Sequence, residues 1–265
     1  MEMLTSAQNE WVSEARKLKQ RKYREAKGLF LAEGIRLSEE AAKAAFVEEV
    51  YYHESLAETE RGAALLKSLS AQAGRFFKVS AKVMNALAET ETPQGVVCVC
   101  RRKQTAMKEF QPRNGLVAAV DGIQDPGNLG SILRTLWAAG GQGLFCLRGS
   151  TDPYGGKCVR ASMGGIFHVP VFADIGWQAA AEWARRQGFR IVAASSGGGK
   201  DYRLMAWPEK TLLCIGSEAM GLASIPAEEV DGQVSIPLAE GAESLNAGVA
   251  GALAMYEVLR QHGVK

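Results

Sequence analysis

From residue 115 onward, the chain alternates short apolar runs with longer stretches in which apolar residues recur every three or four positions. The short runs predict strands and the longer stretches predict helices. Strands are expected at Leu116–Val120, Leu144–Leu147, Val169–Phe172, Arg190–Ala194, Thr211–Ile215 and Val234–Ile236, and helices at Leu129–Ala139, Trp177–Gln187 and Ala247–Arg260. Apolar strands that alternate with helices indicate an α/β fold with a mostly parallel sheet covered on both faces. Such sheets bind ligands beyond the carboxyl ends of their strands.

The first hundred residues have a less regular pattern. Helices are expected at Arg36–Ala45 and Ala57–Leu69, and strands at Val47–Tyr52 and Gly95–Cys100, which is typical of a smaller α/β domain. Residues 101–114 are polar and charged and contain a Pro-Arg-Asn-Gly turn, as linkers do. The pattern therefore predicts one domain over residues 1–100, a linker over 101–114 and a second domain over 115–265.

The charge distribution separates the two parts of the chain further. The net charge is only +2, but residues 1–114 carry 19 Lys and Arg against 15 Glu and no Asp, and the remainder carries 12 basic against 14 acidic residues. The basic excess is concentrated between Arg16 and Lys27, where seven basic residues accompany one glutamate. Such a cluster attracts the phosphates of nucleic acids. A solvated helix face is the other interpretation of this run.

Several classes of protein are excluded by what the chain lacks. No uninterrupted apolar run is long enough to predict a membrane-spanning helix, and the N-terminus does not resemble a signal peptide. The five cysteines form no C-x-x-C pair, so we expect free thiols in a reducing cytoplasm. His and Cys lack metal-ligand spacing, and no metal is expected. The absence of a P-loop and of a G-x-G-x-x-G sequence after the first strand argues against nucleotide hydrolases and dehydrogenases.

Three polar, glycine-rich segments follow predicted strands, at Asp121–Arg134, Gly216–Gly221 and Ile236–Asn246. Asn128 is expected to cap the helix that follows it, and Glu218 is expected at the edge of the sheet. The helix after Asn246 begins with small residues, which favours a tight contact within the domain or between subunits. Because all three segments follow strand ends, we expect them to form one site.

In this order, Asn128–Arg134, Gly216–Gly221 and Ile236–Asn246 resemble the three motifs of the SpoU (TrmH-type) RNA 2′-O-ribose methyltransferases. Ala247-Gly248 departs from the Val-Ser that relatives more often have at this point. Further similarity lies at Lys157–Gly164 and Phe167–Pro170. Upstream, Lys17–Glu25, Phe30–Gly34 and Thr92–Gly95 are similar to the family's N-terminal substrate-binding domain, so the resemblance covers nearly the whole chain.

The resemblance implies a C-terminal domain with a deep trefoil knot, which binds S-adenosylmethionine in a bent pose, and a homodimer that acts on RNA in the cytoplasm. It implies that Gly216, Ile236 and Leu245 line the pocket for the methyl donor. The reaction centre would comprise Asn128, Arg134, Glu218, Ser244 and Asn246. The residues expected to bind the RNA substrate are Lys17, Arg21, Lys22 and Arg24.

The motif-one arginine of this family is commonly described as a general base. Because a guanidinium resists deprotonation, Arg134 is expected instead to hold a phosphate and stabilise the developing alkoxide. Asn128 and Glu218 would orient Arg134, and Ser244 and Asn246 would position the substrate and the loop.

A separate basic domain before the methyltransferase domain suits a large structured RNA, and the arrangement resembles enzymes that act on 23S (large-subunit) rRNA. A tRNA 2′-O-methyltransferase is the first alternative. A non-catalytic RNA-binding or ribosome-assembly factor on the same fold is the second. A chain without residues 1–110 is expected to fold, dimerise and bind the donor, but not to methylate its RNA.

Overall fold

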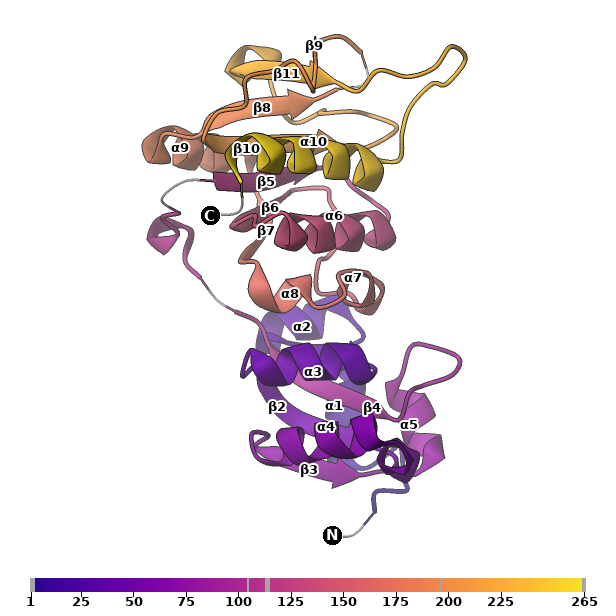
Figure 1. Ribbon diagram of the computed structural model, residues 1–265. Coiled ribbons are helices and arrows are strands. Elements are labelled where there is room, and N and C mark those ends of the chain that lie inside the picture. The colour runs from indigo at the N-terminus through magenta and orange to yellow at the C-terminus, as the bar shows by residue number, and fades with distance from the viewer. Residues whose placement is uncertain (1–2, 104, 113–114, 196, 264–265) are drawn as a thin grey trace. The chain divides into compact units, whose positions relative to one another are not determined.

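The computed structural model describes residues 3–103, 105–112, 115–195 and 197–263. The chain forms two compact units (Figure 1). The first comprises residues 1–103 together with Tyr154–Phe167, and the second comprises Gln104–Pro153 together with His168–Lys265. A short segment from the middle of the chain therefore packs with the N-terminal unit.

The N-terminal unit contains a four-stranded sheet of order β1-β4-β2-β3. Its central strand β4 pairs antiparallel with β1 and β2, and β2 pairs parallel with β3. The strands are β1 (Leu29–Glu33), β2 (Val47–Tyr52), β3 (Arg75–Lys78) and β4 (Val96–Arg101). The helical elements are α1 (Glu10–Lys17), α2 (Arg21–Lys27), α3 (Ile35–Lys43), η1 (Glu54–Glu58), α4 (Glu60–Ser70), α5 (Ala81–Leu87) and α7 (Gly156–Ala161), with α8 (Gly165–His168) at the boundary with the second unit.

The second unit contains a seven-stranded sheet of order β7-β6-β5-β10-β8-β11-β9, and every ladder in it is parallel. Its strands are β5 (Gly115–Asp121), β6 (Gly143–Leu147), β7 (Val171–Ile175), β8 (Arg190–Ala194), β9 (Lys200–Asp201), β10 (Lys210–Gly216) and β11 (Gly232–Ser235). Its helical elements are η2 (Met107–Glu109), α6 (Pro126–Ala138), α9 (Trp177–Gln187), η3 (Ala227–Glu229) and α10 (Ala247–His262). The predicted parallel α/β sheet is confirmed.

The sheet of the second unit is buried between two layers. On one side an aromatic core gathers around Trp183 of α9, whose indole N–H donates to the backbone oxygen of Phe110 at 2.9 Å. Phe110 comes from the segment expected to be a linker and is itself buried in this core. Helices α6 and α10 pack against one another (Figure 1). Gly251 of α10 lets this helix lie close to β10 as well, because a Cβ at this position would lie 2.8 Å from Cδ1 of Ile215.

One prediction about local structure is wrong. Asn128 lies inside α6 rather than at its N-cap, because the helix begins two residues earlier at Pro126. The N-cap is Asp125, whose Oδ1 accepts the backbone N–H of Asn128 at 2.9 Å. Proline at the first helical position is common because its missing N–H has no partner there. The amide side chain of Asn128 is therefore free to make contacts elsewhere.

Candidate active site

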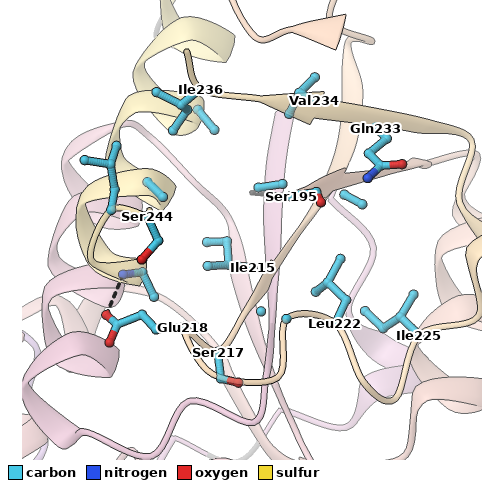
Figure 2. Close-up of a pocket in the computed structure, with 18 of the residues that line it drawn as sticks. Ser195, Ile215, Ser217, Glu218, Leu222, Ile225, Gln233, Val234, Ile236 and Ser244 are labelled. Carbon is cyan, nitrogen blue, oxygen red and sulfur yellow. Dashed lines mark hydrogen bonds between the residues drawn. The ribbon is translucent and has the colours of Figure 1, made fainter. Parts of the chain in front are cut away.

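A cavity of about 340 Å³ lies at the carboxyl ends of β8, β10 and β11 (Figure 2). This is the edge at which parallel sheets bind ligands. Its volume falls within the range of roughly 300–1,000 Å³ that is typical of small-molecule sites. Small side chains form much of the lining, and polar groups are few: Ser195, Ser217, Glu218, Gln233 and Ser244. The cavity can hold a ligand that is partly apolar and carries a few polar groups.

The three residues expected to line a donor pocket, Gly216, Ile236 and Leu245, all line this cavity. Gly216 ends β10, and a Cβ at this position would overlap the carbonyl group of Gly221. Only glycine therefore lets the chain turn back on itself at this end of the strand. Ser244 and Glu218 line the same cavity, and Figure 2 draws them on the same side of it.

Asn128, Glu218 and Asn246 form one hydrogen-bonded network that joins the three motifs. The Asn128 amide donates to Oε1 of Glu218 at 3.1 Å, and the Asn246 amide donates to Oδ1 of Asn128 at 2.9 Å. Oε1 of Glu218 also accepts the backbone N–H of Ala247 at 2.9 Å, a bond drawn in Figure 2. Residues separated by about a hundred positions in the sequence are thus held together by side chains that satisfy one another.

Asn246 has a second role, because it is the N-cap of α10. Its Oδ1 accepts the backbone N–H groups of Gly248 and Val249 at 3.0 and 3.3 Å. An asparagine at this position satisfies backbone donors that would otherwise have no partner at the first turn. The side chain of Asn246 is therefore fixed between the helix start and Asn128.

The surroundings of Arg134 differ from those expected from the sequence. It lies on α6, exposed to solvent, and makes no hydrogen bond or ion pair with any residue that the structure describes. Asn128 and Glu218 bind one another instead of orienting its guanidinium. The expectation that these two residues position Arg134 is wrong, and its charge is available to a bound molecule.

Some lining residues were not predicted. Ala193, Ala194 and Ser195 at the end of β8, and Gln233 on β11, contribute to the cavity. The sequence signal is the change from the apolar run Arg190–Ala194 to Ser195 and then to three glycines. This signal predicts a ligand site less strongly than the three motifs do, because the residues after the strand end are small and none is charged.

The basic segment of the N-terminal unit forms α1, α2 and the turn between them. Lys17 and Lys22 lie over the ring of Tyr23, with Nζ 5.8 and 4.8 Å from the ring centroid. Lys17 also pairs with Glu14 at 2.5 Å, and Arg21 pairs with Glu25 at 2.6 Å. Bonds from Lys17 and Lys27 hold the pKa of Glu14 at about 2, well below its ordinary value. Lys17, Arg21 and Lys22 remain substantially exposed, and Lys17 and Lys22 lie beside the Tyr23 ring.

Arg24 does not belong to that exposed surface. Its side chain is buried, with 6% of the residue exposed, and its Nη1 donates to the backbone oxygens of Leu18 and Lys19, each at 2.8 Å. These carbonyls lie just beyond the end of α1, where backbone acceptors lack helical partners. The prediction that Arg24 binds RNA is therefore corrected: Arg24 joins α2 to the turn after α1.

Two of the three N-terminal segments that carried the resemblance, Phe30–Gly34 and Thr92–Gly95, lie next to one another. Glu33 of β1 accepts the backbone N–H groups of Glu89 and Thr90, and the Ile35 N–H donates to Oε1 of Gln94 at 2.9 Å. Both segments thus fix the loop between α5 and β4.

Neither a metal centre nor a membrane-spanning helix is found in the part of the chain that the structure describes. No group of three or more His, Cys, Asp or Glu residues there could hold a metal ion. No helix of the described ranges is long and apolar enough to cross a membrane. All five cysteines are buried and none forms a disulfide, and burial raises the pKa of the Cys98 thiol to about 12.

Comparison with known proteins places this geometry in a family. Residues 115–256 match the SpoU rRNA Methylase family, and residues 9–98 match the MRM3-like substrate binding domain. The chain is 30% identical to the 23S rRNA (guanosine(2553)-2′-O)-methyltransferase RlmP of Bacillus subtilis over 97% of this chain and 99% of that protein.

Solved structures agree over nearly the full length. An AdoMet-bound rRNA methyltransferase from Sinorhizobium meliloti has a TM-score of 0.85 at 29% identity, covering 98% of this chain and 97% of that one. The SpoU methyltransferase AviRb from Streptomyces viridochromogenes, in complex with AdoMet, has a TM-score of 0.83 at 28% identity, covering 96% and 98%. These matches confirm the expected fold class, a knotted α/β methyltransferase domain with a smaller N-terminal α/β domain. The chain therefore belongs to the SpoU rRNA Methylase family of RNA methyltransferases.

Proposed function

We propose that this protein transfers the methyl group of S-adenosylmethionine to a ribose 2′-hydroxyl of 23S rRNA. The observation that carries the proposal is the joining of the three motifs by Asn128, Glu218 and Asn246 beside a cavity at the strand ends. A relative of full-length similarity is named for 2′-O-methylation of 23S rRNA, and two structural relatives bind AdoMet.

The cavity suits the methyl donor on its own chemistry. S-adenosylmethionine combines an apolar purine face with polar groups, and the lining combines small apolar residues with a few hydroxyl, amide and carboxylate groups. When bound, it supplies a methyl group on a positively charged sulfur, which is already a good electrophile. Gly216, Ile236 and Leu245 would hold it, chiefly through backbone groups and apolar contact.

The protein's own residues then have to position the ribose and manage its hydroxyl proton. An arginine side chain keeps its proton in proteins, so we assign Arg134 the electrostatic role: it holds the nucleotide's phosphate and stabilises the developing negative charge on the 2′-oxygen, whose proton passes to solvent water. Ser244 contacts the substrate from the cavity wall. Asn128, Glu218 and Asn246 together hold the three motifs in fixed positions relative to one another.

RNA is recognised by the N-terminal unit in this proposal. Lys17, Arg21 and Lys22 supply positive charge, and Tyr23 between two lysines supplies an aromatic face. Cationic side chains beside an aromatic ring are suited to phosphates and unstacked bases. The five buried cysteines, none of which forms a disulfide, accord with action in the cytoplasm, where thiols stay reduced.

A homodimer is the proposed state of assembly. Helix α10 exposes Val249 and Tyr256, two turns apart on the helix, at 48% and 50%. Apolar side chains exposed on one helix face favour a contact with a second copy.

Incubation with S-adenosylmethionine labelled on its methyl group, together with total RNA, tests the proposal. We expect label in the large rRNA band, recovered as alkali-resistant dinucleotides, and a mass in solution twice that of one 28.5-kDa chain. Label in the tRNA band instead would identify tRNA, and not rRNA, as the substrate. Binding of the donor without label in naked RNA would point to a ribosomal particle as substrate. The proposal is contradicted if the RNA is not labelled and the protein does not bind the donor.

A further inference from the structure

A buried carboxylate outside the proposed reaction centre lies beside the cavity. Asp121 ends β5 and is only 2% exposed. In the parallel ladder it pairs with Gly216 of β10, the residue at which the cavity begins. Burial of a charged group is costly unless it is well hydrogen-bonded, so the partners of Asp121 indicate what it does.

Both carboxylate oxygens of Asp121 bind the same residue. Oδ2 accepts the backbone N–H of Ser224 at 2.7 Å, and Oδ1 accepts the Ser224 hydroxyl at 2.6 Å. Asp121 and Ser224 are 103 positions apart in the sequence. Two short bonds from one carboxylate fix both the position and the orientation of this residue.

The segment from Ser217 to Ile225 is a closed loop attached at two points. At its start, Ser217 and Gly221 exchange two backbone hydrogen bonds of 3.0 and 2.9 Å, and the Ser217 hydroxyl accepts the Met220 N–H at 3.0 Å. At its other end, Ser224 is held by Asp121. Glu218 lies within the turn that Ser217 and Gly221 close, and Leu222 and Ile225, before and after Ser224, form part of the cavity wall.

We propose that Asp121 is a positioning residue for the methyl-transfer site. By holding Ser224, it fixes the loop in the conformation in which Glu218 bonds to Asn128 and to the start of α10, and in which Leu222 and Ile225 close the cavity. Asp121 does not line the cavity itself, so it acts on the donor through the loop. This inference rests on the proposed function insofar as the cavity holds S-adenosylmethionine.

Four variants separate positioning from stability. Asp121→Ala removes both bonds, and Ser224→Ala removes only the hydroxyl bond at the exposed end of the interaction. Asp121→Asn keeps the shape, because its amide oxygen can accept from the Ser224 N–H while its NH₂ donates to the hydroxyl. The matched control is Thr211→Val, which removes the buried bond from Thr211 to the Pro208 oxygen at the opposite end of β10.

Two readouts are measured for each variant: the Kd for S-adenosylmethionine by calorimetry, and the rate at which glutamyl endopeptidase cuts after Glu218, relative to its other sites. We expect Asp121→Ala to raise the Kd about tenfold and to accelerate cleavage at Glu218 selectively. Ser224→Ala should change both in the same direction by a smaller factor, and Asp121→Asn should restore values close to the wild type. Thr211→Val should lower Tm without changing either readout.

The proposal is overturned if Asp121→Ala or Ser224→Ala leaves both readouts at the wild-type level. It is also overturned if Thr211→Val, compared at the same loss of Tm, changes the Kd and the cleavage rate by as much as Asp121→Ala does. Asp121 would then contribute only to general stability. Should Asp121→Ala fail to fold, Ser224→Ala and Asp121→Asn give the same decision. If the wild type does not bind the donor, the proposed function fails, and cleavage at Glu218 alone decides whether Asp121 holds the loop.

Discussion

The side chains of Asn128, Glu218 and Asn246 use much of their hydrogen-bonding capacity on one another and on the start of α10. Groups that are engaged in this way are fixed before any substrate arrives, and a fixed polar frame needs little reorganisation during reaction. Arg134 is the opposite case, since it is exposed and lacks a partner among the described residues. At the scale of the residue, the site thus consists of a rigid frame and one available cation.

Replacing Arg134 should separate catalysis from donor binding. For Arg134→Ala, and for Arg134→Lys, which lacks the planar fork, we expect turnover to fall about 10²–10³-fold. The Kd for S-adenosylmethionine and the Tm should stay at the wild-type values, because Arg134 neither lines the cavity nor bonds to a described residue.

Steady-state methyl transfer, calorimetry and thermal melting measure the three quantities. Arg186→Ala, at an exposed arginine of α9 in the same unit, is the matched control and should change none of them. Turnover close to wild type for Arg134→Lys would exclude the phosphate-holding role.

Sequence reasoning identified these residues but not their bonds. The three motifs follow strand ends, and the parallel sheet brings such ends to one edge, so their meeting could be predicted. The bond from Asn128 to Glu218 was not predictable in this way, because α6 begins at Pro126 with Asp125 as its N-cap, three residues before the predicted start. Asp121 and Ser224 carry no local signal of their pairing, because 103 positions separate them.

At the scale of the element, prediction succeeded where hydrophobic patterning was strong. The strands β2 and β8 and the helix α9 have the predicted bounds. The edge strand β3, with the sequence Arg-Phe-Phe-Lys, was not predicted because its four residues are too few for alternation to be distinguished. A knot was beyond local pattern altogether, because it depends on the path of the whole chain; only the resemblance implied it.

The basic segment contains residues of two kinds, which substitution should distinguish. Lys17→Ala with Lys22→Ala should weaken binding of a 23S rRNA fragment and reduce the dependence of log K on log salt by about two, without a large change in Tm. Arg24→Ala should instead lower the free energy of unfolding by about 2 kcal/mol, because two backbone carbonyls lose a charged donor.

Filter binding at several salt concentrations and urea unfolding are the measurements. Lys67→Ala, on α4 of the same unit, serves as the control for a lysine outside the basic segment. If the slope of log K against log salt is unchanged in the double variant, Lys17 and Lys22 do not bind RNA phosphates and belong to an ordinary solvated helix face.

At the scale of the whole molecule, the two units are interleaved along the chain. Tyr154–Phe167 lies between β6 and β7 in the sequence but packs within the N-terminal unit. Its aromatic residues contact Phe30, with ring centroids 5.2 Å from Tyr154 and 5.7 Å from Phe167. Arg160 of the same segment pairs with Glu89 at 2.9 Å. A division into one N-terminal and one C-terminal piece of sequence does not describe this packing.

Removal of residues 1–103 should therefore prevent the rest of the chain from folding stably. A chain that begins at residue 104 would expose Tyr154 and Phe167, which are buried in the full protein, so we expect it to aggregate, or to bind a hydrophobic dye and melt without cooperativity. Supplying residues 1–103 as a separate chain should restore cooperative melting. A truncated chain that melts sharply and binds S-adenosylmethionine would instead support the simpler division that the sequence suggested.

The interleaving also bears on the order in which the protein can mature during synthesis. Chains generally fold domain by domain as they leave the ribosome, the N-terminal part first. Here residues 1–103 emerge before Tyr154–Phe167 exists, so the surface around Phe30 and Phe46 has no cover until β6 has also been made. The substrate-binding part of this enzyme thus completes its packing only after translation has passed into the catalytic part, and the nascent chain needs protection over that interval.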